Sequence, residues 1–360
     1  MTTLGDAITT LRQARGLSQT ELAEAVGVTQ VALHRYESGE REPRPQILSE
    51  LASALDVTES FLQHEFRLEG GVAQDAHMRK RKTTKAGDWK LVEARLNELR
   101  MTTAYFLHRA PLIQTHTVPD VDMTVCSPSE AAQLTRARWK MPSGPVPSLT
   151  PWLEAAGIII VQEEFPTAKI DGMSQWGRES GVMLINSLLP PDRRRLTMAH
   201  ELGHLVMHDE VLAGDDDIEK QANEFAAEFL MPAHLMRNEL RPLGGATPQR
   251  TVAILSGLKE VWGASMQALF ERAYQLGIVD GERRQAFYKF LAIRRWKTKE
   301  PGGEMISPET PRLAPSIGES LQRNGFPERE VLNALGASSR SRVAPFFPVE
   351  QPRRSHLRAV

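Results

Sequence analysis

Two histidines and a glutamate stand at a spacing that suits metal-dependent hydrolysis. His200 and His204 are four residues apart on a predicted helix, and Glu201 directly follows the first histidine. Residues four apart lie on one helix face, so both imidazoles can reach one ion while Glu201 projects beside them. A bound zinc ion lowers the pKa of water toward neutrality, and an adjacent carboxylate can take the proton. This H-E-x-x-H pattern predicts a Zn2+ cofactor, with Glu201 as the catalytic base for peptide-bond hydrolysis.

The alternative is that His200 and His204 are ordinary helix residues at a coincidental spacing. Apolar and small residues recur on the same face, so this side of the helix is expected to be buried. Buried imidazoles need partners, and a metal ion supplies one. Gly203 is a poor helix former within an otherwise good helix, which indicates that another segment approaches closely. The residues that share this face are Leu196, Ala199, Gly203 and Met207.

A third ligand is expected from the next predicted helix, residues 218–230, which carries three glutamates. On a helical wheel Glu219 borders the apolar stripe, Glu224 lies nearly opposite and Glu228 falls between them. Glu219 is therefore the predicted third ligand, and the alternative is a solvated carboxylate at the helix start. The rival oxygen donors at 215–217 are more typical of an exposed loop and helix start.

Two polar residues are placed to hold the ligands in position. Asn223 follows Glu219 by four residues and lies on almost the same side of its helix. His208 continues the face of His204 by one turn, and we expect it to orient a ligand or lie at the edge of the site.

The stretch 193–208 and the following stretch 219–232 resemble the ImmA/IrrE family of metallopeptidases. The resemblance implies that the residues His200, His204 and Glu219 bind zinc and that Glu201 is the catalytic base. It also implies a protein substrate, because characterised members cleave helix-turn-helix repressors and so release genes from repression. The match covers about residues 130–275 and includes 139–145, 153–158 and 170–174.

The first seventy residues carry a separate pattern of five short helices. Apolar spacing predicts the first helix over 4–15, and Ser18 to Glu21 form a capping box that opens the second. Gly27 makes the turn, and Thr29 caps a third helix that runs through Tyr36. Two more helices are expected at 46–55 and 58–63.

The pattern from Leu17 to Gly39 resembles the XRE family of Cro/repressor-type helix-turn-helix domains, over about residues 4–63. In such folds the second helix of the motif enters the major groove of a double-stranded DNA operator. Gln30 could then contact adenine, Arg35 guanine and Val31 a thymine methyl, while Gln19 would hold a phosphate. The predicted DNA-facing residues are Gln19, Thr29, Gln30, Val31, His34 and Arg35.

The charge of this module is unusual for a DNA-binding domain, because it has more acidic than basic residues. The alternative is therefore a protein-interaction or dimerisation domain that does not bind DNA. The basic run 79–82 with Lys85 could grip phosphates, or it could be a solvated linker. The acidic residues that argue most against DNA binding are Glu21, Glu24, Glu40 and Glu42.

The remaining elements are predicted from periodicity. Strand-like runs at 157–161 and 181–186 precede the histidine helix. Residues 182–186 are the candidate for an edge strand that aligns a substrate backbone, and the alternative is an internal core strand. Further helices are expected at 89–108, 258–276, 285–295 and, as a pair, 317–335.

The sequence thus predicts a multidomain chain, with an all-α five-helix module, then an α+β zincin-like metallopeptidase domain, then a mainly helical C-terminal extension. The expected boundaries are 1–66 for the helix-turn-helix domain, 67–128 for a linker with a bridging helix, 129–280 for the metallopeptidase domain, 281–336 for the extension and 337–360 for a disordered tail.

Composition sets the remaining expectations. The chain has 360 residues, a net charge of −1 and a single cysteine, Cys126. This excludes an internal disulfide framework and fits a reducing compartment. The chain begins without a signal-peptide pattern and has no apolar run long enough for a bilayer, so a bacterial cytoplasmic protein is expected, with the bacterial origin implied by the resemblances. A homodimer is expected because repressor-type modules read paired half-sites.

Two functional hypotheses follow. In the first, a DNA-binding regulator carries a zinc endopeptidase directed at a repressor, an antitoxin-type protein or itself. In the second, a transcription factor or antitoxin uses a peptidase-like domain to sense a ligand or a metal without cleavage. Glu201 favours the first, because a sensor does not need the base. A fourth protein ligand at the metal would favour the second, because structural zinc sites close that position.

Overall fold

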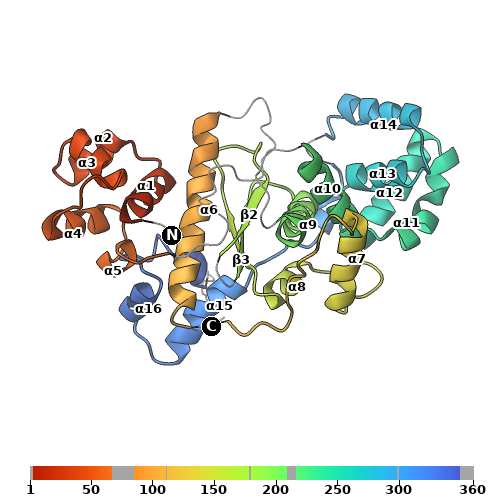
Figure 1. Ribbon diagram of the computed structural model, residues 1–360. Coiled ribbons are helices and arrows are strands. Elements are labelled where there is room, and N and C mark those ends of the chain that lie inside the picture. The colour runs from red at the N-terminus through yellow and green to blue at the C-terminus, as the bar shows by residue number, and fades with distance from the viewer. Residues whose placement is uncertain are drawn as a thin grey trace, which may run out of the picture.

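The computed structural model describes residues 3–66, 85–110, 112–177, 180–208, 216–297 and 300–348. The described N-terminal part is a module of five helices, as the periodicity predicts, and a long helix separates it from a small sheet with further helices (Figure 1). The helices of the module are α1 (Leu4–Ala14), α2 (Gln19–Ala25), α3 (Gln30–Glu37), α4 (Pro45–Ala54) and α5 (Glu59–Leu62).

Local sequence signals define the helix ends in this module. Ser18 and Glu21 form the predicted capping box at the start of α2, and the side chain of Thr29 accepts a hydrogen bond from the amide of Ala32. Gly27 has a φ of 68°, a left-handed conformation that glycine adopts without steric cost. The turn between α2 and α3 is therefore set by local sequence.

Helix α6 (Ala86–Leu107) is more than a bridge, because it belongs to two hydrophobic cores. Met101 and Tyr105 are buried in the core of the N-terminal module. Val92, Leu96 and Leu99 belong to a second core that includes residues of the sheet. Figure 1 shows α6 standing between the module and the sheet. The helix that is expected as part of a linker therefore packs against both the N-terminal module and the sheet.

The sheet has three strands in the order β1-β3-β2, with bounds Ile159–Glu163, Gly172–Trp176 and Gly181–Asn186 for β1, β2 and β3. Strand β3 pairs in parallel with β1 and antiparallel with β2. The expectation that 182–186 forms an edge strand is wrong, because β3 is paired on both sides. Its six residues are all buried, which fits its central position.

Alternate residues of the strands enter different cores, as strand geometry requires. Ile160, Met183 and Ile185 face a core shared with the helices on the histidine side. Ile159 and Val182 face the core that includes α6 and the C-terminal helices. The helices around the first core are α7 (Pro128–Arg138), α8 (Thr150–Ala155), α9 (Pro191–Met207), α10 (Asp216–Leu230), α11 (Ala233–Leu240), α12 (Pro248–Trp262), α13 (Met266–Gln275) and α14 (Gly281–Ile293), with the 3-10 turn η1 (Arg241–Gly245).

The expectation of a single helix over 258–276 is wrong, because two helices cover this range. Helix α12 ends at Trp262, and Gly263 caps it with a left-handed φ of 62°. Helix α13 then begins after Ser265, whose side chain accepts a hydrogen bond from the amide of Ala268. Apolar spacing continues across the break, which is why periodicity alone misses it.

The C-terminal region packs onto the rest of the molecule. Helices α15 (Leu313–Arg323) and α16 (Glu328–Ala334) confirm the expected helical pair, with the 3-10 turns η2 (Gly303–Met305) and η3 (Ala344–Phe346) on either side. The expectation of a disordered tail from 337 is wrong for residues 337–348, because Val343, Phe346 and Phe347 are buried. Residues 349–360 lie outside the described part. No helix described here is both long and apolar enough to cross a bilayer.

Candidate metal centre and DNA-binding surface

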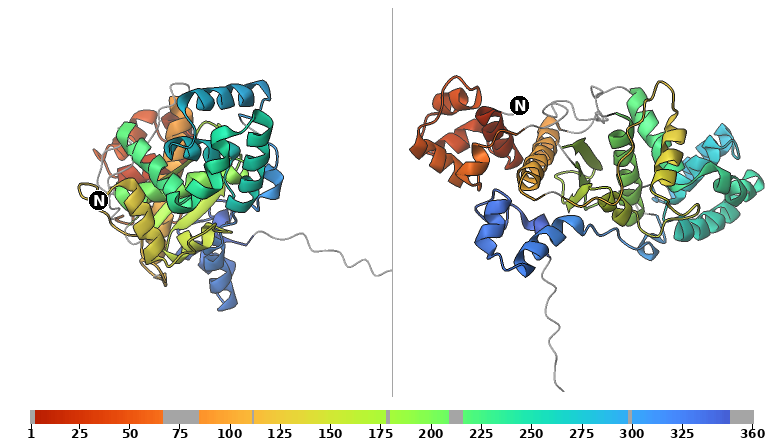
Figure 2. Two further views of the ribbon diagram at one scale, coloured as in Figure 1. Left: turned by 90° about the vertical axis from the view of Figure 1, so that its right-hand side faces the viewer. Right: turned by 60° about the horizontal axis from the view of Figure 1, so that its bottom comes forward.

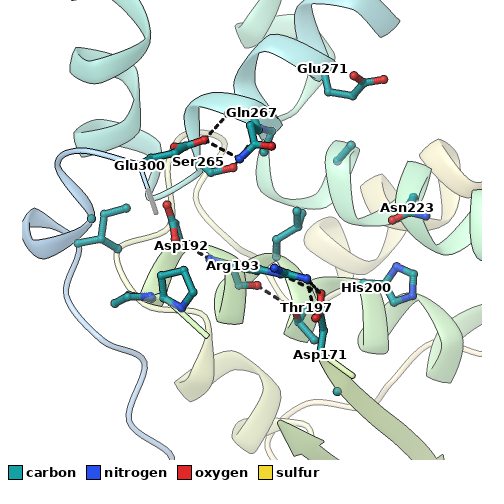
Figure 3. Close-up of a pocket in the computed structure, with 18 of the residues that line it drawn as sticks. Asp171, Asp192, Arg193, Thr197, His200, Asn223, Ser265, Gln267, Glu271 and Glu300 are labelled. Carbon is teal, nitrogen blue, oxygen red and sulfur yellow. Dashed lines mark hydrogen bonds and ion pairs between the residues drawn. The ribbon is translucent and has the colours of Figure 1, made fainter. Parts of the chain in front are cut away.

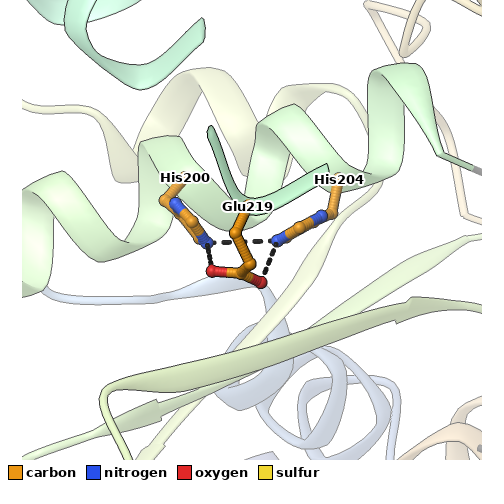
Figure 4. A group of neighbouring side chains, drawn as sticks. All are labelled: His200, His204 and Glu219. Atoms are coloured by element: carbon orange, nitrogen blue, oxygen red, sulfur yellow. Dashed lines mark hydrogen bonds and ion pairs between the residues drawn. The ribbon is translucent and has the colours of Figure 1, made fainter. Parts of the chain in front are cut away.

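The side chains of His200, His204 and Glu219 converge on one point (Figure 4). The two Nε2 atoms are 3.1 Å apart, and the Glu219 carboxylate oxygens lie 3.6 Å from His200 and 3.5 Å from His204. The histidines come from α9 and the glutamate from α10. These helices approach closely at Gly203, where a Cβ atom would meet the ring of Phe225 at 3.1 Å. Gly203, which the sequence analysis expects to permit the close approach of another segment, therefore does so for α10.

The spacing of these atoms fits a tetrahedral zinc ion. For bonds of 2.0–2.1 Å the edge of such a tetrahedron is about 3.3–3.4 Å, close to the three distances between the donor atoms. Burial lowers the pKa of His200 to about 3, and the neighbouring His204 adds to this effect against the opposing carboxylate of Glu219. A neutral His200 is the form that metal binding requires. The donors present therefore fit the ion that the sequence predicts.

His208 lies behind His204 and does not join the converging donors. The Nε2 of His208 donates to Oε1 of Gln221 at 2.8 Å, so its Nδ1 accepts from Nδ1 of His204 at 3.1 Å. These two hydrogen bonds place the ring proton of His204 on Nδ1. The lone pair is then on Nε2, the atom that faces His200 and Glu219. His208 therefore hydrogen-bonds to one of the candidate metal donors, and Gln221 is a partner that sequence reasoning missed.

Glu201 lies beside the three donors and is held by a residue from the sheet. The hydroxyl of Ser174 on β2 donates to Oε2 of Glu201 at 2.7 Å. Burial raises the pKa of Glu201 to about 8, the Ser174 hydrogen bond opposes the rise, and the charge of Glu219 adds to it. A raised pKa makes the ionised carboxylate a stronger base, and a general base is most effective when its pKa lies near the working pH.

The other acidic candidates point elsewhere. The carboxylate of Glu224 accepts from Ser129, Glu228 is buried against Arg272, and Asp217 pairs with Lys220. Asp215 lies outside the described residues, and nothing is described of the side chain of Asp216. Asn223 donates to the backbone oxygen of Glu219 at 2.7 Å and hydrogen-bonds to His200. It therefore lies where the sequence analysis expects a supporting residue.

A groove of about 1190 Å3 opens beside the metal donors. His200, Glu201 and Glu219 line one part of it, and α13 lines the opposite wall with residues that include Gln267 and Glu271 (Figure 3). The part of β2 that contributes to the lining is its first residue, Gly172. Its volume is above the range of about 300–1,000 Å3 that is usual for small-molecule pockets.

The helix-turn-helix residues lie on one exposed surface. Thr29, Gln30, Val31, His34 and Arg35 are all exposed on or at the start of α3. The outward orientation expected from the helical pattern is therefore observed.

Two glutamines connect this surface to the module's interior. Nε2 of Gln30 donates to Gln19 at 2.7 Å, and Nε2 of Gln19 donates to Glu37 at 2.7 Å. Glu37 in turn accepts from the guanidinium of Arg12, with both side chains largely buried. Gln30 is therefore preorganised by a chain of polar contacts that ends in a buried ion pair.

Known family models match both the N-terminal helical module and the region that contains the sheet and the candidate metal centre. The IrrE N-terminal-like domain model, from the M78 peptidase family, matches residues 153–274, and a helix-turn-helix model matches residues 8–62. This chain joins a helix-turn-helix domain of the XRE type to an IrrE-like domain. The first match spans the sheet, both ligand-bearing helices and α13, so it contains the donor trio and the groove wall. M78 peptidases are zinc enzymes, and the trio of the IrrE-like domain can bind a metal.

Ser174 of the IrrE-like domain provides the first testable prediction. Replacement of Ser174 by Ala removes the hydrogen bond that positions Glu201, and a bond to a charged group is worth about 1.5–3 kcal/mol. We expect kcat for peptide cleavage to fall by about ten- to a hundredfold, with KM and zinc content unchanged. Ser174→Thr keeps the hydroxyl and is expected to restore most of the rate.

The matched control is Ser129→Ala, because the hydroxyl of Ser129 also donates to a glutamate, Glu224, on the outer surface. Its kcat should equal that of the unmodified protein. Equal rates for Ser174→Ala and Ser129→Ala would show that Ser174 has no positioning role.

Proposed function

We propose that this protein is a DNA-binding transcriptional regulator whose IrrE-like domain is a zinc-dependent endopeptidase. The observation that carries the proposal is the donor trio with Glu201 beside it. Among the described residues no fourth side-chain donor joins His200, His204 and Glu219, and His208 is engaged with Gln221. A metal held by three protein ligands with one open position is typical of a catalytic zinc site.

The residues have separate roles in this proposal. His200, His204 and Glu219 hold the zinc ion. When bound there, the ion supplies Lewis acidity toward water and toward a peptide carbonyl. Glu201 takes a proton from the attacking water and delivers it to the leaving amine. Ser174 fixes the carboxylate of Glu201, and His208 and Asn223 fix the ligands.

The groove provides the place for a polypeptide substrate. Its lining includes Asp171 and Gly172, at the start of β2. The described sheet has two edge strands, β1 and β2, and β2 is the one that contributes to this lining. Strand addition of a substrate is therefore expected along β2 instead of β3. We propose a repressor or antitoxin-type protein, or a second copy of this chain, as the substrate, with loss of repression as the result.

The test combines metal analysis with mass spectrometry. We expect the purified protein to contain one zinc per chain and, with zinc, to convert a candidate repressor or its own chain into two fragments. Chelation should stop cleavage, and restored zinc should restart it. Bound zinc without any cleavage would replace the peptidase with a non-cleaving sensor, and absence of zinc binding would refute the metal site.

The DNA-binding part makes a separate prediction. With operator duplexes selected in vitro from random sequence, Gln30→Ala and Arg35→Ala should each weaken binding by about 1–3 kcal/mol and relax preference at one base pair. Fluorescence anisotropy at fixed salt measures the loss.

Lys289→Ala is the control, because it removes an exposed cation from α14, outside both the helix-turn-helix domain and the matched IrrE-like region. Its DNA affinity should be unchanged. If no duplex binds more tightly than random DNA, the module is a protein-interaction domain. We further propose that the regulator acts as a homodimer on paired half-sites.

A further inference from the structure

The segment 300–347, here called the strap, begins in the wall of the groove. Glu300, Glu304 and Ile306 line the groove. The buried carboxylate of Glu300 accepts from the amides of Met266 at 2.7 Å and Gln267 at 3.0 Å, and from the ammonium group of Lys259 at 3.0 Å. The start of the strap is therefore fixed to the first turn of α13.

A second buried carboxylate anchors the middle of the strap. Glu309 accepts from the amides of Leu149 at 2.7 Å and Thr150 at 3.0 Å, and from the hydroxyl of Thr150 at 2.6 Å. Arg195 of α9, in the same helix as the metal-binding histidines, lies 3.3 Å from this carboxylate. The strap is thus tied to the helix that carries the candidate metal centre.

The far end of the strap is fixed to the DNA-binding domain. The backbone oxygen of Gly336 accepts from the amide of Thr58 at 3.1 Å, and the hydroxyls of Ser338 and Ser339 donate to the carboxylate of Asp56. A Cβ atom at Gly336 would lie 2.1 Å from the ring of Phe61, so glycine is needed for this contact. Two segments about 280 residues apart in sequence therefore form one interface.

Arg342 closes the interface between the strap, α6 and the DNA-binding domain. Its guanidinium donates to Glu98 at 2.9 Å and Thr102 at 3.0 Å, and lies 4.5 Å from the ring centroid of Phe61. Glu98 also pairs with Arg15 of α1. Figure 2 shows the C-terminal helices, in blue, beside the DNA-binding domain and α6. Helix α6 itself reaches back to the groove, where Trp89 forms part of the lining.

We propose that the strap makes the groove an effector site for the DNA-binding domain, so that a polypeptide bound against residues 300–308 changes how that domain binds DNA. That the ligand is a polypeptide rests on the proposed function. The physical basis is that both elements that hold the DNA-binding domain, the strap and α6, also form walls of the groove. A ligand that binds one position of the strap more tightly shifts the strap toward that position, and the proposal is that the far end moves with it. Linkage requires the reverse effect too, because DNA then changes the affinity for the groove ligand by the same factor.

Hydrogen exchange of the full-length protein, followed by mass spectrometry, tests the coupling in both directions. Glu300→Ala releases the strap from α13 and leaves Lys259 paired with Asp192 at 2.8 Å. We expect amide exchange over residues 56–62 to accelerate about fivefold or more. In the reverse direction, Asp56→Ala should accelerate exchange of the Met266 and Gln267 amides by a similar factor. Helix α1 should change by less than about twofold in both variants.

The control is Glu260→Ala, an exposed glutamate on α12 that is neither part of the strap nor among the residues that line the groove. Its exchange should match that of the unmodified protein at both ends. Unchanged exchange at the distant end in both variants would overturn the proposal. Acceleration that is equal throughout the chain, including α1, would also overturn it, since it reports general loss of stability.

A second measurement connects the strap to DNA. Affinity for a pool of random 30-base-pair duplexes at low salt is expected to change at least threefold in Glu300→Ala and to remain unchanged in Glu260→Ala. Equal affinity of the two variants would overturn the link to DNA. Failure of the unmodified protein to cleave a substrate or to bind zinc would refute the proposed function. The hydrogen-exchange results would still test the coupling between the two ends of the strap.

Discussion

Glu201→Gln is expected to lower kcat for substrate cleavage by about 10^2–10^4-fold, the range for loss of a general base. Glutamine keeps the size of the side chain and can still contact Ser174, but it cannot accept the proton from water. Zinc content is expected to stay at one per chain, because Glu201 is not among the three converging donors. Mass spectrometry of the substrate fragments measures the cleavage rate, and metal analysis of the same sample measures the zinc content.

Glu224→Gln is the matched control, because Glu224 is a glutamate on the adjacent helix that also accepts from a serine. Its rate and its zinc content should equal those of the unmodified protein. A Glu201→Gln protein that still cleaves at the control rate would remove Glu201 from the mechanism. Loss of zinc from Glu201→Gln would instead make Glu201 a ligand.

Arg272→Ala should destabilise the IrrE-like domain by about 3–5 kcal/mol, the cost of leaving one partner of a buried pair without the other. The side chains of Arg272 and Glu228 are 5% and 2% exposed, and the guanidinium also donates to the backbone oxygen of Met231 at 3.0 Å. Alanine removes both contacts and leaves the Glu228 carboxylate buried. Urea unfolding followed by a signal from this domain measures the loss.

The comparison pair is Arg284 and Glu271, whose side chains are 41% and 29% exposed. Arg284→Ala should cost about 1 kcal/mol or less, because solvent screens an exposed pair. A double variant, Arg272→Met with Glu228→Met, is expected to recover much of the lost stability by removing both charges. A loss below 1 kcal/mol in Arg272→Ala would show that this pair is not desolvated.

Short-range patterns determined the chemistry of the site. His200, Glu201 and His204 stand on one helix, so their relative placement follows from helical geometry once the helix is recognised. Glu219 could be ranked above Glu224 and Glu228 because the apolar stripe shows which side of the second helix is buried. The caps at Ser18 and Thr29 and the turn at Gly27 are also local, and the structure contains all three.

Relations between distant segments could not be obtained in this way. Ser174 is 27 residues from Glu201, and only the packing of β2 on α9 brings its hydroxyl to the carboxylate. The central position of β3 depends on which strands pair, and a buried strand has the same apolar pattern at an edge and in the centre. The break at Gly263 is hidden because apolar spacing continues from α12 into α13.

The strap is the clearest case of a feature decided by tertiary structure. Its composition, rich in proline, glycine and serine, suggests disorder from residue 337 onward. Phe346 and Phe347 are nevertheless buried, and Arg342 and Gly336 contact helices from the first third of the chain. Sequence by itself predicted the candidate metal donors, the proposed base and the helix-turn-helix module, because each follows from the spacing of residues within one or two neighbouring helices. Tertiary structure decided how the groove and the DNA-binding domain are joined, because burial of the strap depends on surfaces that exist only after distant segments have packed.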